Sequence, residues 1–368
     1  MGKNKKIRIF MIGYSPYKGG VESFASNLVE NMDSSRFEVI HKMPKMIIDG
    51  KKWEAPLTRH NFIKYYFFWK RFYRQNKFEI IYLNTCDVVS TDQLKFAKHA
   101  GIQVRIIHAH SSGIQQALCK NLSFFHKISE KISRKKLDKY ATHFFACSKS
   151  AGDWMFDDRK YKIIYNGVKL SDYIFSEHNR KELRKGYGYS SEKIIGVIGR
   201  LSPVKNLEFA IDIIEHAVNL SPQCKGVFIG DGELRDYLQS QIIRKGLDNK
   251  IQLIGAVDNI NEWLSAVDCI LMPSLFEGLP FVLVEAQAAG LHCVVSSAVS
   301  QEANITGLVE YVSLDEDKET WAMKVLDACE QPRVDVSQKL TDAGYYIEDT
   351  AKTVSEIIEN SLHNQRKS

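Results

Sequence analysis

The sequence predicts an α/β protein with two domains, each built on a doubly wound parallel sheet. Its 368 residues are enough for about two domains. The composition, 44% hydrophobic and 26% charged, is that of a globular protein. In both halves of the chain, short β-rich runs alternate with segments of helical length, and this alternation is typical of parallel βαβ units.

The first half begins with a buried strand, "KIRIFMIGY", followed by a glycine-containing loop and the helix "GVESFASNLVENMD". Further β-rich runs follow, mostly separated by segments of helical length. These runs read "FEVIHKM", "FEIIYLNT", "IQVRIIHAH" and "THFFACS". We therefore expect residues 1–170 to form one domain.

The second half repeats the pattern with five β-rich runs and helices between them. These runs read "KIIGVIGR", "KGVFIGD", "KIQLIGA", "DCILMPS" and "HCVVSS". The stretch "YKIIYNGVKLSDY" contains a strand and then an Asn-Gly turn, which predicts a domain boundary near residue 170. We expect the second domain over residues 171–335, and a helical segment over 336–368 that is able to pack back across either domain.

Charge is distributed unequally along the chain, although the net charge is only +6. Residues 1–170 hold 31 Lys and Arg against 14 Asp and Glu, a net charge of +17, and the remainder has a net charge of −11. A strongly basic half suggests nucleic acid, an anionic membrane surface or a phosphorylated ligand. No apolar run is long enough to span a membrane, and the start of the chain lacks the apolar region of a signal peptide, so we expect a cytoplasmic protein.

Several motifs follow the predicted strands, where doubly wound sheets bind their ligands. After the first strand, Gly19 and Gly20 precede a helix. A glycine pair lets the backbone come close to a ligand, and the free N–H groups of a helix start favour an anion. Taken alone, this stretch fits an ordinary βα turn equally well.

In the second half, "GVIGRLSPVKN" places Arg200 at the end of a strand and Lys205 five residues later. Two cations on such a loop suit a diphosphate, because Arg can fork onto phosphate oxygens and Lys adds a point charge. The alternative is two exposed cations without a ligand. The next strand ends in a glycine-flanked turn, Gly230, Asp231 and Gly232, which leaves room for a nucleotide or is a plain turn with Asp231 as a helix cap.

The stretch "SLFEGLPFVLVEAQAAG" holds two carboxylates eight positions apart, Glu277 and Glu285. We expect a loop, then a helix with Pro280 in its first turn and Gly290 as its stop. Glu277 precedes this helix and can accept hydrogen bonds from sugar hydroxyls. Glu285 lies inside an otherwise apolar helix, where a carboxylate is poorly explained as a core residue, and it can accept from ribose hydroxyls.

Together, "GGVES", "YNGV", "GRLSPVKN", "GDGEL" and "FEGLPFVLVEAQAAG" resemble the GT-B retaining glycosyltransferases of family GT4. The family's acidic residue, seven positions and then Glu is met by Glu277 and Glu285. The resemblance spans residues 7 to about 335. It implies two Rossmann-like domains facing a central cleft and a hexosyltransferase activity, and within the family the chain is similar to bacterial enzymes that assemble capsule, exopolysaccharide or wall glycans.

The resemblance also implies roles for these residues. Arg200 and Lys205 would hold the nucleotide diphosphate and stabilise the charge of the leaving group, Glu285 would bind the ribose, and Glu277 would contact the donor sugar. Gly19 and Gly20 match a flexible loop that closes over donor and acceptor. The donor-binding set is completed by Gly199, Gly230, Asp231, Gly278, Leu279 and Pro280, with the N–H groups of Gly278 and Leu279 near the phosphates.

The family carries a histidine beside the donor sugar, and "RIIHAHSSG" offers His108 and His110. Residues two apart in a strand point to the same side, and His110 is nearer the carboxyl end, so we favour His110 and keep His108 as the alternative. A zinc pair would need further ligands, and none is evident in the sequence. We expect no metal or other cofactor, and a UDP-sugar as the donor.

Retention ordinarily requires a nucleophilic carboxylate on the face opposite the leaving group, and no residue clearly supplies one. The resemblance therefore implies same-face attack, in which the acceptor hydroxyl is hydrogen-bonded to the departing phosphate oxygen. Arg200, Lys205 and the helix N-terminus would stabilise the diphosphate as it leaves.

Two basic segments of the first half suggest contact with an anionic membrane. Residues 61–78 interleave aromatic side chains with Lys64, Lys70, Arg71, Arg74 and Lys77, and residues 124–140 form a second basic helix. Such helices suit the lipid headgroup region, which makes a glycan linked to a lipid diphosphate the expected acceptor. The alternative is a solvated basic helix with its aromatic rings in the core. No nucleic-acid-binding motif is evident.

Three other functions fit the sequence less well. A nucleotide-sugar epimerase of similar fold would need no acceptor and no membrane-facing helix. A dinucleotide-dependent dehydrogenase would need a G-x-G-x-x-G turn with an acidic residue about 20 positions later, and neither half has this pattern. A non-catalytic nucleotide-sugar binding module would have no use for the combination of Glu277, His110, Arg200 and Lys205.

Overall fold

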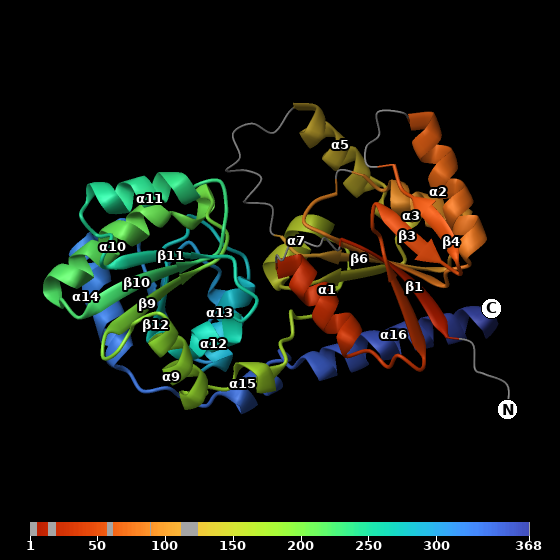
Figure 1. Cartoon of the computed structure of the whole chain (residues 1–368). Helices are drawn as coiled ribbons and strands as arrows, with labels where there is room; N and C mark the ends of the chain where they lie inside the picture. Colours follow the sequence, from red (N-terminus) through yellow and green to blue (C-terminus); the bar gives the residue numbers. More distant parts are fainter. Residues whose placement is uncertain (1–5, 14–19, 57–61, 89, 112–123, 368) are drawn as a thin grey trace. The chain divides into compact units, whose positions relative to one another are not determined.

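The first of two parallel sheets has six strands in the order β2-β1-β5-β6-β7-β8 (Figure 1). Neighbouring strands are parallel throughout, and β1 lies between β2 and β5, so the chain winds outward in both directions from β1. The strands are β1 (Ile7–Ile12), β2 (Phe37–His41), β5 (Ile80–Thr85), β6 (Val104–Ala109), β7 (His143–Ala146) and β8 (Lys162–Ile163).

This computed structural model describes residues 6–13, 20–56, 62–88, 90–111 and 124–367. The chain forms two units, residues 1–167 with 347–368, and residues 168–346. The helices of the first unit are α1 (Gly20–Glu30), α2 (Phe62–Asn76), α3 (Asp92–His99), α5 (Phe124–Lys135), α6 (Leu137–Tyr140), α7 (Lys149–Phe156) and α16 (Ile347–Lys367).

The C-terminal helix α16 belongs to the first unit, although it follows the second unit in the chain. It packs against α1 and β6, and Figure 1 shows it in blue below α1 and β1. His143 Nε2 and Ser361 Oγ are 2.8 Å apart, and Arg36 forms an ion pair with Glu359. The chain therefore returns to its first unit to complete that unit's surface.

A short antiparallel hairpin, β3 (Lys45–Ile48) and β4 (Lys51–Glu54), also belongs to the first unit and was not predicted from the sequence. Its turn residues Asp49 and Gly50 both have positive φ, as a two-residue hairpin turn requires. The hairpin carries Trp53 into the core, where its ring centroid lies 5.0 Å from that of Phe72 on α2.

Four of the aromatic side chains of α2 are in the core and are unavailable to a membrane. Tyr65, Trp69, Phe72 and Tyr73 are buried, and they recur at the spacing of one helical face. For these four residues the alternative prediction, a basic helix with its aromatic rings in the core, is correct. The expectation that they meet lipid headgroups is wrong. The opposite face of α2 exposes other residues, which are considered below.

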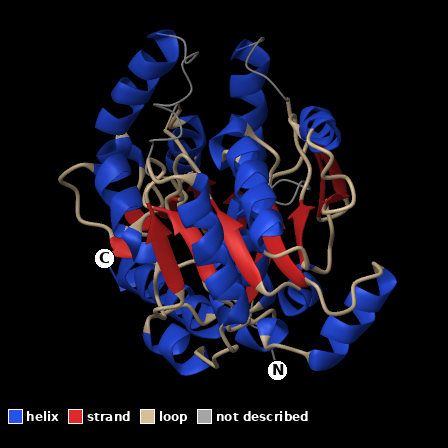
Figure 2. Ribbon diagram, turned by 90° about the vertical axis from the view of Figure 1, so that its left-hand side faces the viewer, coloured by secondary structure: helices blue, strands red, loops and turns tan. Residues whose placement is uncertain are grey.

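The second unit has a six-stranded parallel sheet in the order β11-β10-β9-β12-β13-β14. Figure 2 shows parallel strands in red with helices in blue beside them. The sixth strand, β14, was not among the five predicted. The strands are β9 (Lys193–Ile198), β10 (Cys224–Ile229), β11 (Ile251–Gly255), β12 (Cys269–Met272), β13 (Cys293–Ser296) and β14 (Val309–Val312).

Both faces of this second sheet are covered. Along β9, Ile195 and Val197 face one hydrophobic cluster, and Ile194 and Ile198 face the other. Double burial explains why the strand is continuously apolar. The helices of the unit are α8 (Leu170–Tyr173), α9 (Glu177–Gly186), α10 (Leu207–Leu220), α11 (Arg235–Arg244), α12 (Ile260–Ala266), α13 (Phe281–Ala288), α14 (Lys318–Glu330) and α15 (Ser337–Asp342).

The two sheets agree with the predicted pair of Rossmann-like α/β domains. Among the described helices, none is both long enough and apolar enough to cross a bilayer.

Candidate functional site

The candidate site lies at the carboxyl ends of the strands in the second unit. Gly199 directly follows β9, and Gly230 directly follows the neighbouring strand β10. Both have a φ of 142°, and a Cβ on Gly230 would collide with the Gly199 carbonyl oxygen. The two glycines therefore let the strand-end loops approach closely, and they bring Arg200 and Asp231 to the same edge of the sheet.

Arg200 is exposed, and its guanidinium contacts Glu233, with Nη2 3.2 Å from Glu233 Oε2. This surface pair is weak enough for a ligand to displace. The Asp231 carboxylate accepts a hydrogen bond from the N–H of Gly232, at 2.8 Å. Because α11 begins at Arg235 with Leu234 as its N-cap, Asp231 does not cap that helix.

Lys205 and Glu277 form an ion pair, with Lys205 Nζ 2.6 Å from Glu277 Oε1. Lys205 ends the 3₁₀ turn Pro203–Lys205, and Asn206, in the left-handed conformation, is the N-cap of α10. The backbone of Glu277 is held by the loop after β13, because its carbonyl accepts a hydrogen bond from the N–H of Ser300. The backbone around Lys205 and Glu277 therefore determines where each residue lies, and no single flexible side chain does.

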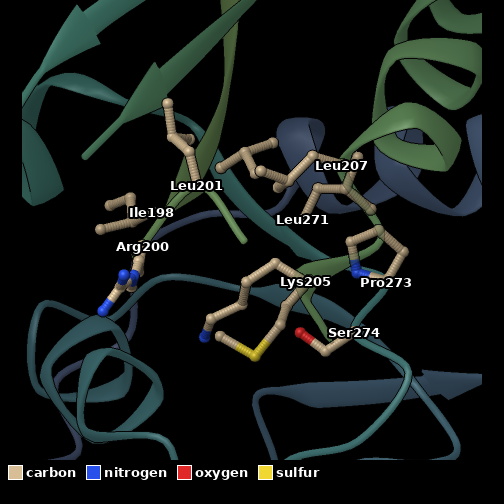
Figure 3. Close-up of a pocket in the computed structure, with 11 residues that line it drawn as sticks. Ile198, Arg200, Leu201, Lys205, Leu207, Leu271, Pro273 and Ser274 are labelled. Carbon is tan, nitrogen blue, oxygen red and sulfur yellow. The ribbon is translucent and has the colours of Figure 1, made fainter. Parts of the chain in front are cut away.

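A pocket at the ends of β9 and β12 contains part of this arrangement (Figure 3). In this view the Lys205 side chain lies between Arg200 and Ser274. The Ser274 hydroxyl oxygen is buried and makes no hydrogen bond to any described residue. Sequence reasoning did not single out Ser274, which carries no local signal beyond its place after a strand.

The loop before α13 presents unused backbone donors. The N–H groups of Gly278 and Leu279 donate no hydrogen bond to another residue in the described part of the chain. Pro280 is the N-cap of α13 with a ψ of 124°, so the helix begins at Phe281, one residue later than predicted. The prediction was wrong because the extended backbone at Pro280 lies outside the helix. Gly290, with a φ of 69°, follows the C-cap and ends the helix as expected.

Glu285 is buried within α13 and is 9% exposed. The Tyr173 hydroxyl on α8 donates a hydrogen bond to Glu285 Oε1, at 2.8 Å. Burial raises the pKa of Glu285 to about 7, and this hydrogen bond opposes the rise. Tyr173 lies 112 residues from Glu285 in the sequence, so no local pattern could have paired them.

The two candidate histidines lie together in the first unit. His108, on β6, is fully buried, and its Nδ1 is 3.0 Å from the Tyr82 hydroxyl. His110 follows β6 and is partly exposed, with Nε2 3.0 Å from Asn84 Oδ1. Burial lowers the pKa of both imidazoles, that of His110 to about 3. Both rings are therefore neutral at neutral pH, when they can donate and accept hydrogen bonds but carry no charge.

The structure groups Arg200, Lys205, Glu277 and Glu285 on the second unit, and His108 with His110 on the first. Gly20 is the first residue of α1 and is exposed, whereas Gly19 lies outside the described residues. Within the described ranges, no three His, Cys, Asp or Glu side chains gather as metal ligands would.

Comparison with known proteins identifies relatives over much of the chain. EpsF of Bacillus subtilis strain 168 is 27% identical over 259 residues, covering 68% of this chain and 66% of EpsF. The UDP-Gal:alpha-D-GlcNAc-diphosphoundecaprenol alpha-1,3-galactosyltransferase of Escherichia coli is 36% identical over 155 residues, 38% of each chain. This chain thus matches about two thirds or less of the length of these relatives.

Among solved structures, Anabaena HepE in complex with UDP-glucose is 18% identical, with a TM-score of 0.67 over 98% of this chain and 100% of HepE. This likeness confirms the predicted GT-B fold. Residues 192–331 match the family described as "Glycosyl transferases group 1", a range that holds Arg200, Lys205, Glu277 and Glu285. Over residues 192–331 the chain is therefore similar to the group 1 glycosyl transferases, and its fold is that of HepE.

Proposed function

We propose that this protein is a retaining glycosyltransferase that moves a hexose or N-acetylhexosamine from a UDP-sugar to a glycan acceptor linked to a lipid diphosphate. The observation that carries the proposal is the group formed by Lys205, Glu277 and the unpaired N–H groups of Gly278 and Leu279. It joins donors for a diphosphate to a carboxylate for sugar hydroxyls, at the edge of the sheet where such folds bind ligands.

Charge determines the chemistry of the proposed transfer. Cleavage of the anomeric C–O bond leaves an oxocarbenium-like sugar and a diphosphate that carries the electron pair. Arg200, Lys205 and the N–H groups before α13 stabilise the diphosphate, because they lie ready to interact with the charge that develops there. The acceptor hydroxyl attacks the same face of the sugar and passes its proton to the departing phosphate oxygen. Glu277 binds the sugar hydroxyls.

The choice of donor and acceptor draws on the relatives. HepE has been crystallised with UDP-glucose, and the name of the Escherichia coli relative specifies a UDP-Gal donor and a diphosphoundecaprenol-linked acceptor. These names support a UDP-sugar and a lipid-linked acceptor for this chain too, and we extend the proposal to a role in bacterial surface polysaccharide synthesis.

A lipid-linked acceptor requires access to a membrane surface, and the first unit offers a face for it. On α2, Ile63 and Phe67 are 68% and 61% exposed and lie one helical turn apart, flanked by Lys64 and Arg71. Apolar side chains bordered by cations are typical of helices that bind anionic headgroups. We propose that the enzyme acts at the inner face of the cell membrane, and the exposed face of α2 supports this proposal.

Thermal shifts with UDP-, GDP- and ADP-sugars test the donor, because a ligand that binds only the native state raises its melting temperature. A UDP-sugar should raise the melting temperature of the wild type and of Glu310→Ala, a surface control on β14, and should raise that of Lys205→Ala by less. Turnover should then require a lipid-diphosphate acceptor. Conversion of the UDP-sugar without an acceptor would instead indicate the epimerase, and no shift with any nucleotide-sugar would refute the transferase.

A further inference from the structure

Tyr173 is the one side chain that donates a hydrogen bond to the Glu285 carboxylate within the described residues. It lies on α8, a four-residue helix that packs against α12 and α13 in the second unit. Its ring packs against the hydrophobic cluster on that side of the sheet, so the hydroxyl is its polar end.

The position of this hydroxyl is determined by contacts on both sides of α8. Before the helix, the N–H of Val168 donates to the Tyr345 carbonyl at 2.9 Å. After it, the N–H of Ser176 donates to Ser265 Oγ at 3.2 Å, and the Arg333 guanidinium lies 4.6 Å from the centroid of the Phe175 ring. Because the segment is held at both ends, Tyr173 reaches Glu285 without ordering a flexible loop.

The other described residues around Glu285 do not bind its carboxylate, so the carboxylate depends on the hydrogen bond from Tyr173. Across the described part of the chain, no Lys or Arg forms an ion pair with Glu285, and its Oε2 accepts no hydrogen bond. The other titratable groups on the packed elements are engaged elsewhere. Asp172 pairs with Lys169, Glu262 on α12 accepts from Asn259, Cys293 on β13 is buried, and Arg333 donates to backbone carbonyls.

We propose that Tyr173 is a positioning residue for the donor: its hydroxyl holds Oε1 of Glu285 and leaves Oε2 for the ribose hydroxyls of a UDP-sugar. The inference rests on the proposed function and adds a residue to it. A hydrogen bond to a carboxylate favours its ionised form. Tyr173 therefore also keeps Glu285 able to accept two hydrogen bonds at a lower pH than burial alone would allow.

The test measures the dissociation constant of UDP by calorimetry between about pH 5.5 and pH 8.5, a window that brackets the titration of Glu285. Wild-type affinity should rise through about pH 7. In Tyr173→Phe, the midpoint of that rise should move up by about one pH unit, and the two proteins should converge at high pH. Glu285→Gln should show only the rise that ionisation of the terminal phosphate of UDP, with a second pKa of about 6, causes in all three proteins.

A second measurement does not depend on any ligand. In protein labelled with ¹³C at the glutamate carboxyls, the Glu285 signal, assigned from its absence in Glu285→Gln, should titrate at a higher pH in Tyr173→Phe. Tyr237→Phe is the matched control, because the Tyr237 hydroxyl bonds Glu208 on the exposed surface of the same unit. This control should leave both profiles unchanged.

The outcomes separate the two proposals. If wild type binds no UDP at any pH, the proposed function fails, and the role of Tyr173 fails with it. If UDP binds and Tyr173→Phe has the wild-type pH profile, or weakens UDP by the same factor at every pH, only the positioning role of Tyr173 is overturned.

Discussion

Lys205 and Glu277 are each other's partners in the candidate site, at 2.6 Å and with side chains only 17% and 11% exposed. The pair joins the turn after β9 to the loop before α13, two segments 72 residues apart in the chain. A diphosphate would attract the same ammonium, and sugar hydroxyls would use the same carboxylate. Donor binding must therefore share or replace this ion pair.

We predict that breaking the pair on one side destabilises the second unit. Lys205→Met or Glu277→Gln leaves a mostly buried polar partner unsatisfied, which costs about 3 kcal/mol and lowers the melting temperature by about 6–12 °C. Scanning calorimetry provides the measurement. The double variant should lose less than the sum of the two single variants, because it leaves no partner behind. Strictly additive losses would show that the pair contributes nothing.

The same pair predicts opposite effects on UDP binding. Glu277→Gln releases the Lys205 ammonium, so UDP, which lacks the sugar, should bind as tightly as to wild type or more tightly, while sugar transfer falls. Lys205→Met should weaken UDP by about tenfold, the worth of one charge-assisted contact. Calorimetric titration with UDP and a transfer assay compare the two variants. Equal loss of UDP affinity in both would contradict competition for Lys205.

Glu285 should make stability depend on pH. Its pKa in the folded protein, about 7, is above the ordinary value of 4.5, so the native state keeps a proton that the unfolded chain releases. The stabilisation is therefore complete below about pH 4.5 and is lost as pH rises to about 7, with an upper limit of ~3 kcal/mol. The melting temperature of wild type, relative to Glu285→Gln, should fall across this window. Parallel curves for the two proteins would exclude the titration.

Two glycines that end helices provide a matched pair of substitutions. Gly246 after α11 and Gly290 after α13 have φ values of 68° and 69°. A Cβ on Gly246 meets nothing within 4 Å, whereas one on Gly290 would lie 2.5 Å from the Val334 carbonyl oxygen. Gly246→Ala should therefore cost about 1 kcal/mol, from left-handed backbone strain alone.

Gly290→Ala should cost clearly more than Gly246→Ala, because Val334 must also move. Calorimetry of both variants gives the comparison. UDP binding adds a second readout, since α13 carries Glu285 and begins beside Gly278 and Leu279. Equal melting temperatures for the two variants would mean that the contact with Val334 relaxes without cost.

Most strands that the sequence predicted are covered on both faces, because double burial makes a strand continuously apolar, whereas the predicted edge strands β2 and β11 are partly exposed. The hairpin β3 and β4 and the edge strand β14 were missed. Exposed and buried positions alternate in Lys45–Ile48, and Val309–Val312 is buried only at its two ends, so the apolar runs are too short to stand out. The Asp49-Gly50 turn was the available signal for the hairpin.

Candidate site residues could be proposed where they follow strands or share one short motif, as Glu277 and Glu285 do. The residues that contact them could not be predicted from the sequence. Lys205 meets Glu277 because the second sheet brings two distant loops to one edge, and Tyr173 meets Glu285 because α8 packs against α13. In the same way, the composition of α2 indicated a basic aromatic helix, but tertiary packing decided which of its rings are buried.

The exposed face of α2 gives the last prediction. Replacing Ile63 and Phe67 together by Ser should weaken binding to vesicles of phosphatidylcholine and phosphatidylglycerol by about tenfold or more, because two apolar side chains no longer enter the headgroup layer. The melting temperature should barely change, since both side chains are exposed. Higher salt should weaken wild-type binding, because the cations beside them act through screened charge.

Ile243→Ser on α11 is the control for this prediction. Ile243 is 59% exposed, like Ile63 and Phe67, but it lies on the second unit, in the acidic part of the sequence. Vesicle co-sedimentation should find the control equal to wild type. If the control and the α2 variant lose binding equally, or if neither does, the face of α2 is not a membrane-binding surface, and access to a lipid-linked acceptor must come from another part of the protein.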